Sequence, residues 1–490
     1  MRKFPDEKLL KSKTRPYFNH SIELKNNFNT EERAKMMENV GLNVFFFPAE
    51  MITGCDFLSD SGTTTMTNRQ WAELHLGDEA YGSNKGFFLF RNQIMELFGR
   101  EFFNEPSEKP NAFIFHQGRP AEDALFTALG KTGNELIIPS NGHFDTTEAN
   151  IEANKIKPIN LFSNELKNIS SLHKFKGNMN ILELEELIKS SKDKIPLIYL
   201  TITNNTGGGQ PVSMENIQQV SKIAHGNNIP LFFDACRFAE NAWFIKKYEE
   251  GHSNKTIKEI VKEMFSHVDG FTISFKKDGL SNIGGGLFIR NNGLFSQKFP
   301  KISDDLTNFQ ILKEGHPTYG GMSGRDIMAL VEGLKTITKE KYLNHRIKQV
   351  QYFGEQMHKK GIPVLMPIGG HAIYLDVNRF FEGTTMKPED FGGISFTALL
   401  LALYGHRACE LGYFAFGSYN SETKEEKFPE VNFVRFAVPR LRYEKEDLDS
   451  VIEAVYNLYE NRKSIPGIEI TYGKELPLRH FKAKFKFQNN

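Results

Sequence analysis

The sequence predicts an α/β protein: a large domain built on a mostly parallel sheet, and a second, smaller domain. Short apolar runs alternate with amphipathic helical stretches between residues 112 and 289, a pattern typical of parallel sheets covered by helices on both faces. The chain has 490 residues, which is too long for one compact core. In sheets of this kind, ligands bind beyond the carboxyl ends of the strands.

Each predicted strand is a short run of apolar residues that ends at glycine, proline or polar residues. In chain order, the strands of the large domain are expected at residues 112–117, 136–139, 196–202, 230–234 and 270–274, with a return strand at 285–289. Helical periodicity covers residues 30–37 and 69–97.

A helix rich in Lys and Leu over residues 332–353 is expected to lead into the second domain. That domain should be α+β, with strands at 371–376 and 432–438, a helix at 395–410 and an exposed charged loop at 419–430. We therefore divide the chain into an N-terminal segment that packs with the small domain, a large domain and a small domain, over residues 1–60, 61–330 and 331–490.

Composition argues against several classes of protein. Lys and Arg number 61 against 60 Asp and Glu, so no strong field for nucleic acid or a membrane surface is expected. The cysteines, Cys55, Cys236 and Cys409, are few and scattered, which indicates a reducing compartment without a disulfide framework or metal cluster. The N-terminus lacks the apolar core of a signal peptide, and no apolar run approaches the roughly 20 residues that span a bilayer. A cytoplasmic protein is predicted.

Two strand ends carry residues that suit pyridoxal phosphate (PLP). The run at 230–234 ends in Asp234 followed by Arg237, and the run at 270–274 ends in Ser274, followed by Lys276 and Lys277. A lysine amine can form a Schiff base with an aldehyde, while an aspartate keeps a pyridinium nitrogen protonated. Hydroxyl and ammonium groups suit a phosphate. Each residue alone is usually solvated surface, but their order and spacing together favour a PLP enzyme.

Further motifs make the chain similar to the β-eliminating lyases of aromatic amino acids, the family of tryptophanase and tyrosine phenol-lyase. The resemblance begins near Leu58 and reaches the C-terminus, whereas the first fifty-odd residues match poorly. It implies the PLP-dependent, aspartate aminotransferase-like fold (fold type I), with a seven-stranded sheet. The matching motifs include Ser59-Asp60-Ser61-Gly62-Thr63, Gly77-Asp78-Glu79-Ala80-Tyr81, His116-Gln117-Gly118-Arg119, Thr203-Asn204-Asn205, Glu240-Asn241-Ala242, Pro317-Thr318-Tyr319, Gly369-Gly370-His371, Arg435-Phe436-Ala437-Val438-Pro439-Arg440 and Leu478-Arg479-His480-Phe481.

The resemblance assigns a cofactor role to ten residues. It implies that a glycine-containing turn, an arginine, Ser274 and Lys276 hold the phosphate, that an aromatic ring stacks on the cofactor, and that Lys277 binds it covalently. A Gly-Arg turn is commonly structural, and an isolated Phe is more often core. The ten residues are Gln117, Gly118, Arg119, Phe144, Asn205, Asp234, Arg237, Ser274, Lys276 and Lys277.

The resemblance also implies a monovalent-cation site, for potassium or ammonium, and shared active sites. Gly62, Glu79 and Asn282 match the cation ligands. Tyr81 matches a tyrosine that reaches the cofactor from a neighbouring subunit and assists departure of the leaving group. A homotetramer of two tight dimers is therefore expected, although a buried phenol is usually only a structural hydrogen-bond partner.

Substrate contacts follow from the same comparison. Arg435 matches the clamp on the substrate carboxylate, and Asn205 and Tyr319 are expected to contact the substrate. Asp145, His480 and Leu411 carry the residues of the tryptophan-cleaving members, where the phenol-lyases have Thr, Phe and Arg. The favoured activity is β-elimination of L-tryptophan to indole, pyruvate and ammonium, with Lys277, Tyr81, Asp145 and His480 catalytic.

The sequence leaves other functions open. The alternatives are a tyrosine phenol-lyase, another PLP lyase for cysteine- or serine-type substrates, and a PLP-fold protein without turnover. Phe275 and Pro120 depart from the family pattern next to the cofactor lysine and the phosphate arginine. Because Phe275 adds bulk there, we expect it to alter the range of substrates more than the type of reaction.

Overall fold

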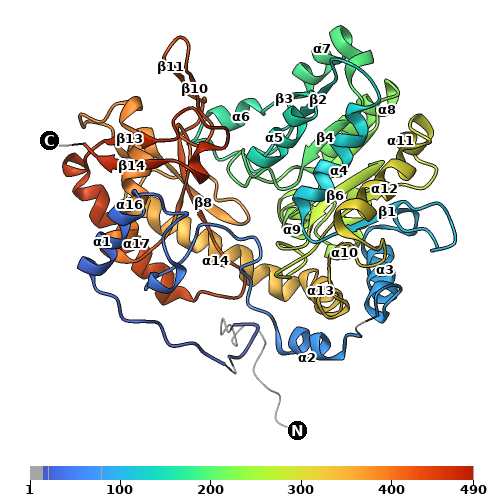
Figure 1. The fold of residues 1–490 in the computed structure, drawn as a ribbon, viewed down its shortest axis with the longest axis horizontal. Coiled ribbons are helices and arrows are strands. Elements are labelled where there is room, and N and C mark those ends of the chain that lie inside the picture. The colour runs from blue at the N-terminus through green and yellow to red at the C-terminus, as the bar shows by residue number, and fades with distance from the viewer. Residues whose placement is uncertain (1–14, 20, 79, 489–490) are drawn as a thin grey trace.

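The computed structural model describes residues 15–19, 21–78 and 80–488. Its centre is a seven-stranded sheet in the order β1-β7-β6-β5-β4-β2-β3 (Figure 1). The β7 strand runs antiparallel to β1 and β6, and the other pairs are parallel, so the predicted fold class is confirmed. The strands are β1 Ala112–Phe115, β2 Ile137–Ser140, β3 Lys157–Asn160, β4 Ile198–Thr201, β5 Leu231–Asp234, β6 Gly270–Ser274 and β7 Gly285–Ile289.

Both faces of this sheet are apolar, because helices cover each of them. Successive residues of β5 show the alternation: Phe232 packs into one hydrophobic cluster and Phe233 into the other. The helices of this part of the chain are α2 Asn68–Leu76, α3 Lys85–Phe98, α4 Gly118–Gly130, α5 Asp145–Ala153, α6 Asn164–Lys167, α7 Ile181–Ser191, α8 Met214–Gly226, α9 Phe238–Tyr248, α10 Ile257–Ser266, α11 Leu294–Lys298, α12 Ile302–Glu314 and α13 Gly324–Ile337.

The second part of the chain is organised around an antiparallel sheet in the order β8-β12-β9, with a two-stranded sheet β13-β14 and a hairpin β10-β11 (Figure 1). Segment α1 Thr30–Asn39 packs on α16, which places the N-terminal region against this part. The remaining elements are α14 Glu340–Lys359, β8 Ala372–Asp376, α15 Val377–Phe380, α16 Gly392–Tyr404, β9 Cys409–Leu411, β10 Ser418–Asn420, β11 Glu425–Lys427, β12 Phe433–Ala437, α17 Lys445–Glu460, β13 Ile468–Tyr472 and β14 Lys484–Phe487. Short 3₁₀ helices lie at Ala49–Met51, Arg100–Phe102, Lys192–Lys194, Pro388–Asp390, Arg462–Ser464 and Arg479–Phe481.

Several expected helices are shorter than their periodicity suggests. The helix at 69–97 is two helices, because Asn84 caps a new N-terminus by accepting from the Phe87 N–H at 2.9 Å. The helix at 395–410 ends at Tyr404, where Gly405 adopts a left-handed φ of 72°, and the residues that follow form β9. The helix at 332–353 is the end of α13 and the start of α14, and the loop at 419–430 contains the β10–β11 hairpin. From the sequence, no strand is predicted at β3, β9, β10, β11, β13 or β14.

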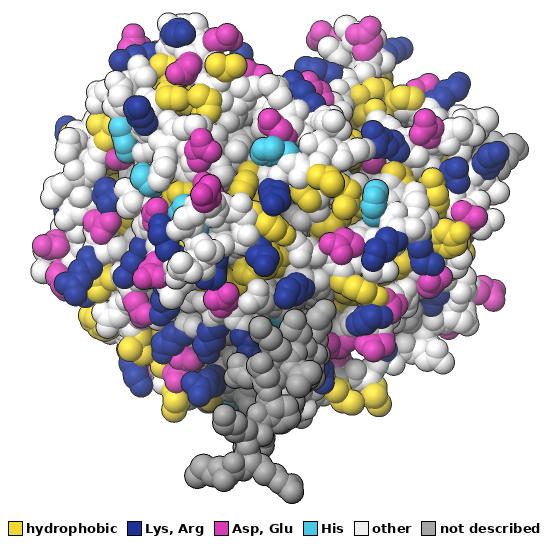
Figure 2. Space-filling view, turned by 180° about the vertical axis from the view of Figure 1, so that it is seen from behind, with side chains coloured by type: hydrophobic (Ala, Val, Ile, Leu, Met, Phe, Trp, Pro, Cys, Tyr) yellow, Lys and Arg dark blue, Asp and Glu magenta, His cyan; other side chains and the backbone are white. Residues whose placement is uncertain are grey.

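Acidic and basic side chains are interspersed over the face in Figure 2, as the near-zero net charge suggests. None of the helices in the described ranges combines the length and apolar character required to cross a bilayer.

Candidate active site

A cavity of about 250 Å³ lies at the carboxyl ends of the parallel strands. Loops after β1, β2, β4, β5 and β6 form one wall, as expected for a sheet of this class. The opposite wall comes from β9, β12, the 3₁₀ helix at 479–481 and the N-terminal segment. The cavity is therefore built from parts of the chain that are far apart in sequence.

Most of the predicted site residues line this one cavity. It brings together Gln117, Gly118, Arg119, Phe144, Asp145, Asn205, Asp234, Arg237, Ser274, Lys276, Lys277, Leu411, Arg435 and His480. Tyr81, Tyr319, Gly62 and Asn282 do not line it in the single chain, and Glu79 lies outside the described residues.

The N-terminus of α4 faces one end of the cavity. Its N-cap, Gln117, makes no side-chain capping bond, so the first N–H groups of the helix remain available to an anion. A Cβ on Gly118 would meet the Cβ of Ser274 at 2.8 Å, so glycine is needed for this close approach. Pro120 falls in the first turn of the same helix, where a missing N–H costs little, so this departure from the family pattern is accommodated.

Three cations surround the same end: Arg119, Lys276 and Lys277. Among the described residues, none of the three forms an ion pair with a carboxylate. Burial, the charge of Lys277 and that of Arg119 together lower the pKa of the Lys276 ammonium. Unpaired cations at an uncapped helix N-terminus suit a phosphate dianion.

Asp234 ends β5 at the floor of the cavity and is buried. Its Oδ1 accepts the backbone N–H of Cys236 at 3.2 Å. Glu122, on α4, also lines the floor, and its Oε1 accepts the Thr147 hydroxyl at 2.9 Å. Burial, followed by the charge of Asp234, raises the pKa of Glu122 to about 8. Glu122 is thus a carboxyl group that holds its proton more tightly than an ordinary glutamate, because its pKa is raised by burial and by the charge of Asp234.

Arg435 and Asn205 meet across the cavity, the first from β12 and the second from the loop after β4. Arg435 NH1 donates to Asn205 Oδ1 at 3.4 Å, and its NH2 donates to the Leu58 carbonyl at 3.1 Å. The Tyr374 hydroxyl also donates to Asn205 Oδ1, at 2.7 Å, and His371 Nε2 lies 3.0 Å from it. These three contacts all use the side-chain oxygen of Asn205, and the residue lines the cavity.

Asp145 and His480 lie together although α5 and the 3₁₀ helix at 479–481 are distant in sequence. Asp145 Oδ2 is 3.3 Å from His480 Nε2, and both side chains are buried. Their alignment does not make a hydrogen bond, so both ring nitrogens of His480 remain without a hydrogen-bond partner among the described residues. Leu411 lines the same cavity and is apolar.

The two tyrosines and the cation residues form separate arrangements. Tyr81 is 73% exposed, and its ring packs edge-on against those of Tyr319 and His316. Asn282 Nδ2 donates to the Gly62 carbonyl at 2.9 Å, so these two residues are neighbours. The roles predicted for Tyr81, Tyr319, Gly62, Asn282 and Glu79 therefore stay predictions.

The Phe275 side chain points away from the cavity. It is fully buried and packs edge-on against Phe90, with Phe288 also in contact. Phe275 therefore adds its bulk to the aromatic core and not to the cavity, whereas its neighbours Ser274 and Lys276 line the cavity; the expected effect on the range of substrates stays a prediction.

The sequence assigned no role to several cavity residues, Glu122 and Phe45 among them. Glu122 could have been noticed, since it stands one helical turn after Gly118. Phe45 lies in the poorly matching N-terminal region, and its ring contacts His480 and Phe481 at centroid distances of 5.8 and 4.7 Å. No local signal indicated that contact.

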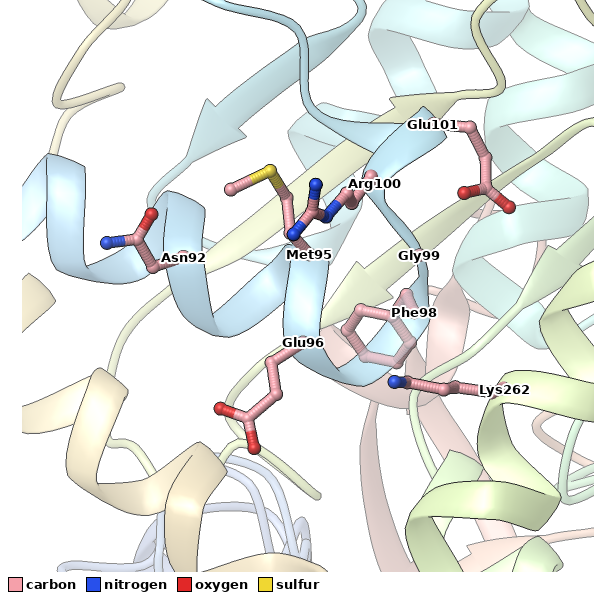
Figure 3. Close-up of a pocket in the computed structure, with 8 residues that line it drawn as sticks. All are labelled: Asn92, Met95, Glu96, Phe98, Gly99, Arg100, Glu101 and Lys262. Carbon is pink, nitrogen blue, oxygen red and sulfur yellow. The ribbon is translucent and has the colours of Figure 1, made fainter.

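A larger surface hollow, of about 550 Å³, lies between α3 and α10 and contains none of the predicted site residues (Figure 3). Its acidic side chains already have partners, since Glu96 pairs with Lys258 and Glu101 pairs with Arg290. We therefore place the chemistry in the smaller cavity, where convergent polar groups and unpaired cations meet.

The residues of the smaller cavity fit PLP. The uncapped helix, the close Gly118–Ser274 contact and the unpaired cations suit its phosphate. Asp234 is placed at a strand end as an acceptor for a protonated ring nitrogen, and Lys277 Nζ makes no hydrogen bond or ion pair with the described residues.

Comparisons with known proteins agree with this chemistry. Residues 56–454 match the family described as beta-eliminating lyase. A tryptophanase of Hyphomonas neptunium is 38% identical over 97% of this chain and 100% of its own length. A tyrosine phenol-lyase of Lacrimispora saccharolytica is 37% identical over 98% of both chains, so identity alone does not separate the two activities.

Solved structures support the fold. An aspartate aminotransferase from Thermotoga maritima, 12% identical, superposes with a TM-score of 0.55 over 89% of this chain and 98% of that one. An aminotransferase from Staphylococcus aureus, 14% identical, gives a TM-score of 0.54 over 83% and 94%. These structures show the fold, while the family match and the two relatives show that the chain belongs to the β-eliminating lyase family of PLP-dependent enzymes.

Proposed function

We propose that this protein cleaves L-tryptophan to indole, pyruvate and ammonium. The observation that carries the proposal is the buried Asp145–His480 pair, 3.3 Å apart, in the same cavity as Leu411 and Arg435. A carboxylate is an acceptor for an indole N–H, and an apolar leucine suits the benzo ring of an indole. This set offers an acceptor and an apolar contact where a phenolate would need a cationic donor.

In this proposal the cofactor is held at both ends. The α4 N-terminus, Arg119, Ser274 and Lys276 bind the phosphate, Asp234 pairs with the ring nitrogen, and Lys277 forms the covalent link. Bound PLP supplies an electron sink for the bond-breaking steps. The Phe144 ring is close to the Arg435 guanidinium, with 6.0 Å between the guanidinium carbon and the ring centroid, and is proposed to cover the cofactor face.

The substrate amino acid is proposed to bind through its carboxylate. Arg435 has one guanidinium nitrogen, Nε, without a partner in the described structure, and its other two nitrogens are already fixed by Asn205 and Leu58. A guanidinium oriented in this way loses little freedom on binding a carboxylate. The α-carbon would then lie near Lys277, whose amine is placed to accept the α-proton.

Departure of the arene requires a proton on its attachment carbon, since a bare aryl carbanion is too poor a leaving group. We assign support of this step to Asp145, which accepts the indole N–H and makes the ring more basic, with His480 behind it. Tyr81 is proposed to deliver the proton from a neighbouring subunit, and its exposure in the single chain supports that role. Tyr319 packs against Tyr81 and would orient it.

The proposal extends to assembly and ions. Gly62, Asn282 and Glu79 are assigned to a potassium or ammonium site, supported by the contact between Gly62 and Asn282. A homotetramer with shared active sites in the cytoplasm completes the proposal. No nucleic-acid or membrane partner is proposed.

The test is a substrate panel. The purified protein with PLP and potassium is incubated with tryptophan, tyrosine, S-methylcysteine and serine, and pyruvate and the released arene are measured. Indole release from tryptophan should exceed phenol release from tyrosine. Lys277→Ala, treated identically, reports any background reaction of free PLP. Faster phenol release would make the protein a tyrosine phenol-lyase, and pyruvate from cysteine or serine derivatives alone would indicate a lyase for small substrates.

A further inference from the structure

Four charged residues have no role in the proposed chemistry: Asp60, Glu240 and Arg440, which belong to the motifs quoted above, and Asp278, which directly follows Lys277. The structure brings all four together. Arg440, which is fully buried, donates from NH1 to Asp60 Oδ2 at 3.0 Å and from NH2 to Glu240 Oε1 and Asp278 Oδ1, both at 2.8 Å. One guanidinium therefore joins three carboxylates.

Two further arginines complete the cluster. Arg237 binds Asp60 through Nε and NH2, at 3.1 and 2.8 Å, in a bidentate pair. Arg346, on α14, donates from Nε to Glu240 Oε1 at 3.1 Å. We call Asp60, Arg237, Glu240, Asp278, Arg346 and Arg440 the buried ion cluster; its three guanidinium groups balance its three carboxylates.

The cluster is linked to the wall of the cavity that carries Lys277 through Asp278 and Arg237. Asp278 directly follows Lys277, and its Oδ2 accepts the backbone N–H groups of Ala239 and Glu240 at 2.8 and 3.1 Å. Asp278 is therefore held against the start of α9, as well as by Arg440. Arg237, the N-cap of α9, lines the cavity itself.

The third connection leads to the opposite wall. Arg440 lies just beyond β12, the strand that carries Arg435, and its carbonyl accepts the Thr65 N–H at 3.1 Å. Asp60 and Ser61 of the same N-terminal stretch line the cavity. Through the buried ion cluster, Arg440 thus connects the loop that carries Lys277, the start of α9, and the cavity wall that carries Arg435.

We propose that Arg440 is a positioning residue: through Asp278 and Asp60 it fixes Lys277 and Arg237 of one cavity wall relative to Arg435 of the other. A single guanidinium with a rigid fork can satisfy three carboxylates, whereas an ammonium cannot hold the same geometry. The inference depends on Lys277 being the cofactor lysine, but not on the identity of the substrate.

The experiment compares two aspartates on either side of β6, one directly before it and one in the loop after it. Asp278→Asn weakens the cluster just after Lys277 and is close in shape to the original residue. Asp269→Asn is its matched control: Asp269 precedes β6, is buried, and accepts the N–H groups of Leu231 and Leu294 beside His225. Both variants lose a buried charged acceptor, but only one adjoins the cavity.

The readouts are thermal unfolding of each apoprotein, its affinity for PLP, and the visible circular dichroism per bound cofactor at saturating PLP. We expect similar losses of thermal stability in both variants. Asp278→Asn should weaken PLP binding at least tenfold and reduce the visible dichroic signal, which reports how the bound cofactor is oriented. Asp269→Asn should retain both properties within twofold.

Two results would overturn the proposal: Asp278→Asn with unaltered PLP affinity and dichroism, or Asp269→Asn with the same losses as Asp278→Asn. If Asp278→Asn does not fold, Arg440→Lys is measured in its place against the same control, and normal dichroism in Arg440→Lys refutes the positioning role. Lys277→Ala tests separately the assumption that Lys277 is the cofactor lysine. If the absorbance band of lysine-bound PLP persists in this variant, another lysine binds the cofactor, whichever substrate is cleaved.

Discussion

Replacement of Asp145 by alanine tests the proposed recognition of indole most directly. The carboxylate is buried and lies 3.3 Å from His480, so no solvent replaces it as an acceptor for the indole N–H. A hydrogen bond to a charged group contributes about 1.5–3 kcal/mol, and support of a proton transfer contributes roughly 10²–10⁴-fold in rate. We therefore expect a fall of at least about 100-fold in kcat/KM for tryptophan.

The comparison substrate is S-methylcysteine, whose thiolate leaves without protonation of a ring. Its kcat/KM should fall less than about tenfold in Asp145→Ala, because a site built to hydrogen-bond one substrate loses little on a substrate that lacks that group. Both rates are measured on one preparation at saturating PLP, which removes differences in folded or loaded fraction.

Glu148→Ala is the matched control. Glu148 and Asp145 are both acidic residues in the first turn of α5, where a negative charge interacts favourably with the helix dipole, but Glu148 does not line the cavity. Glu148→Ala should leave the ratio of the two rates unchanged. Equal losses on tryptophan and S-methylcysteine in Asp145→Ala would refute the indole-recognition role.

Three further predictions concern the cofactor, the ion and pH. Lys277→Ala should lose the visible absorbance of lysine-bound PLP, and a spectrum like that of the unmodified protein would move the covalent link to Lys276. Replacing potassium by sodium should weaken PLP affinity, and Glu79→Ala should abolish the difference; equal affinity in both salts would remove the cation site. Burial and Asp234 raise the pKa of Glu122 from 4.5 to about 8, so between these values the folded apoprotein binds a proton that the unfolded chain has released. Its free energy of unfolding should therefore fall with rising pH, by at most about 1.4 kcal/mol per pH unit from this group, and Glu122→Gln should flatten that dependence in urea titrations at pH 6 and 8.

Local sequence was sufficient for the α/β class and for the expectation that the strand-end residues meet in one cavity. The strand ends at Asp234 and at Ser274 to Lys277 are short apolar runs followed by polar residues, and parallel strands place such ends at one edge of a sheet. Residues that are neighbours in the chain at these ends are neighbours in the cavity. The family resemblance, now confirmed by the comparisons, added the residues of the opposite wall.

Element boundaries depended on single positions that periodicity does not reveal. The glycine at 405, with its left-handed backbone, ends α16 early and frees residues 409–411 to pair with β12. Leu411 therefore reaches the cavity from a strand and not from a helix. The direction of the Phe275 side chain is also not revealed by the sequence pattern, and it decides whether the bulk of this residue meets the cofactor or the core.

Contacts between distant segments were decided by the tertiary structure alone. Nothing near Asp60, Glu240, Asp278 or Arg440 in the sequence indicates that they share one buried ion cluster, or that Phe45 packs beside His480. The physical reason is that a buried charge needs a partner but does not specify where in the chain the partner stands. The sequence by itself determined the fold class and, through the family resemblance, named most of the cavity residues. Only the packing of the two walls decided that Phe45 and the buried ion cluster lie beside them.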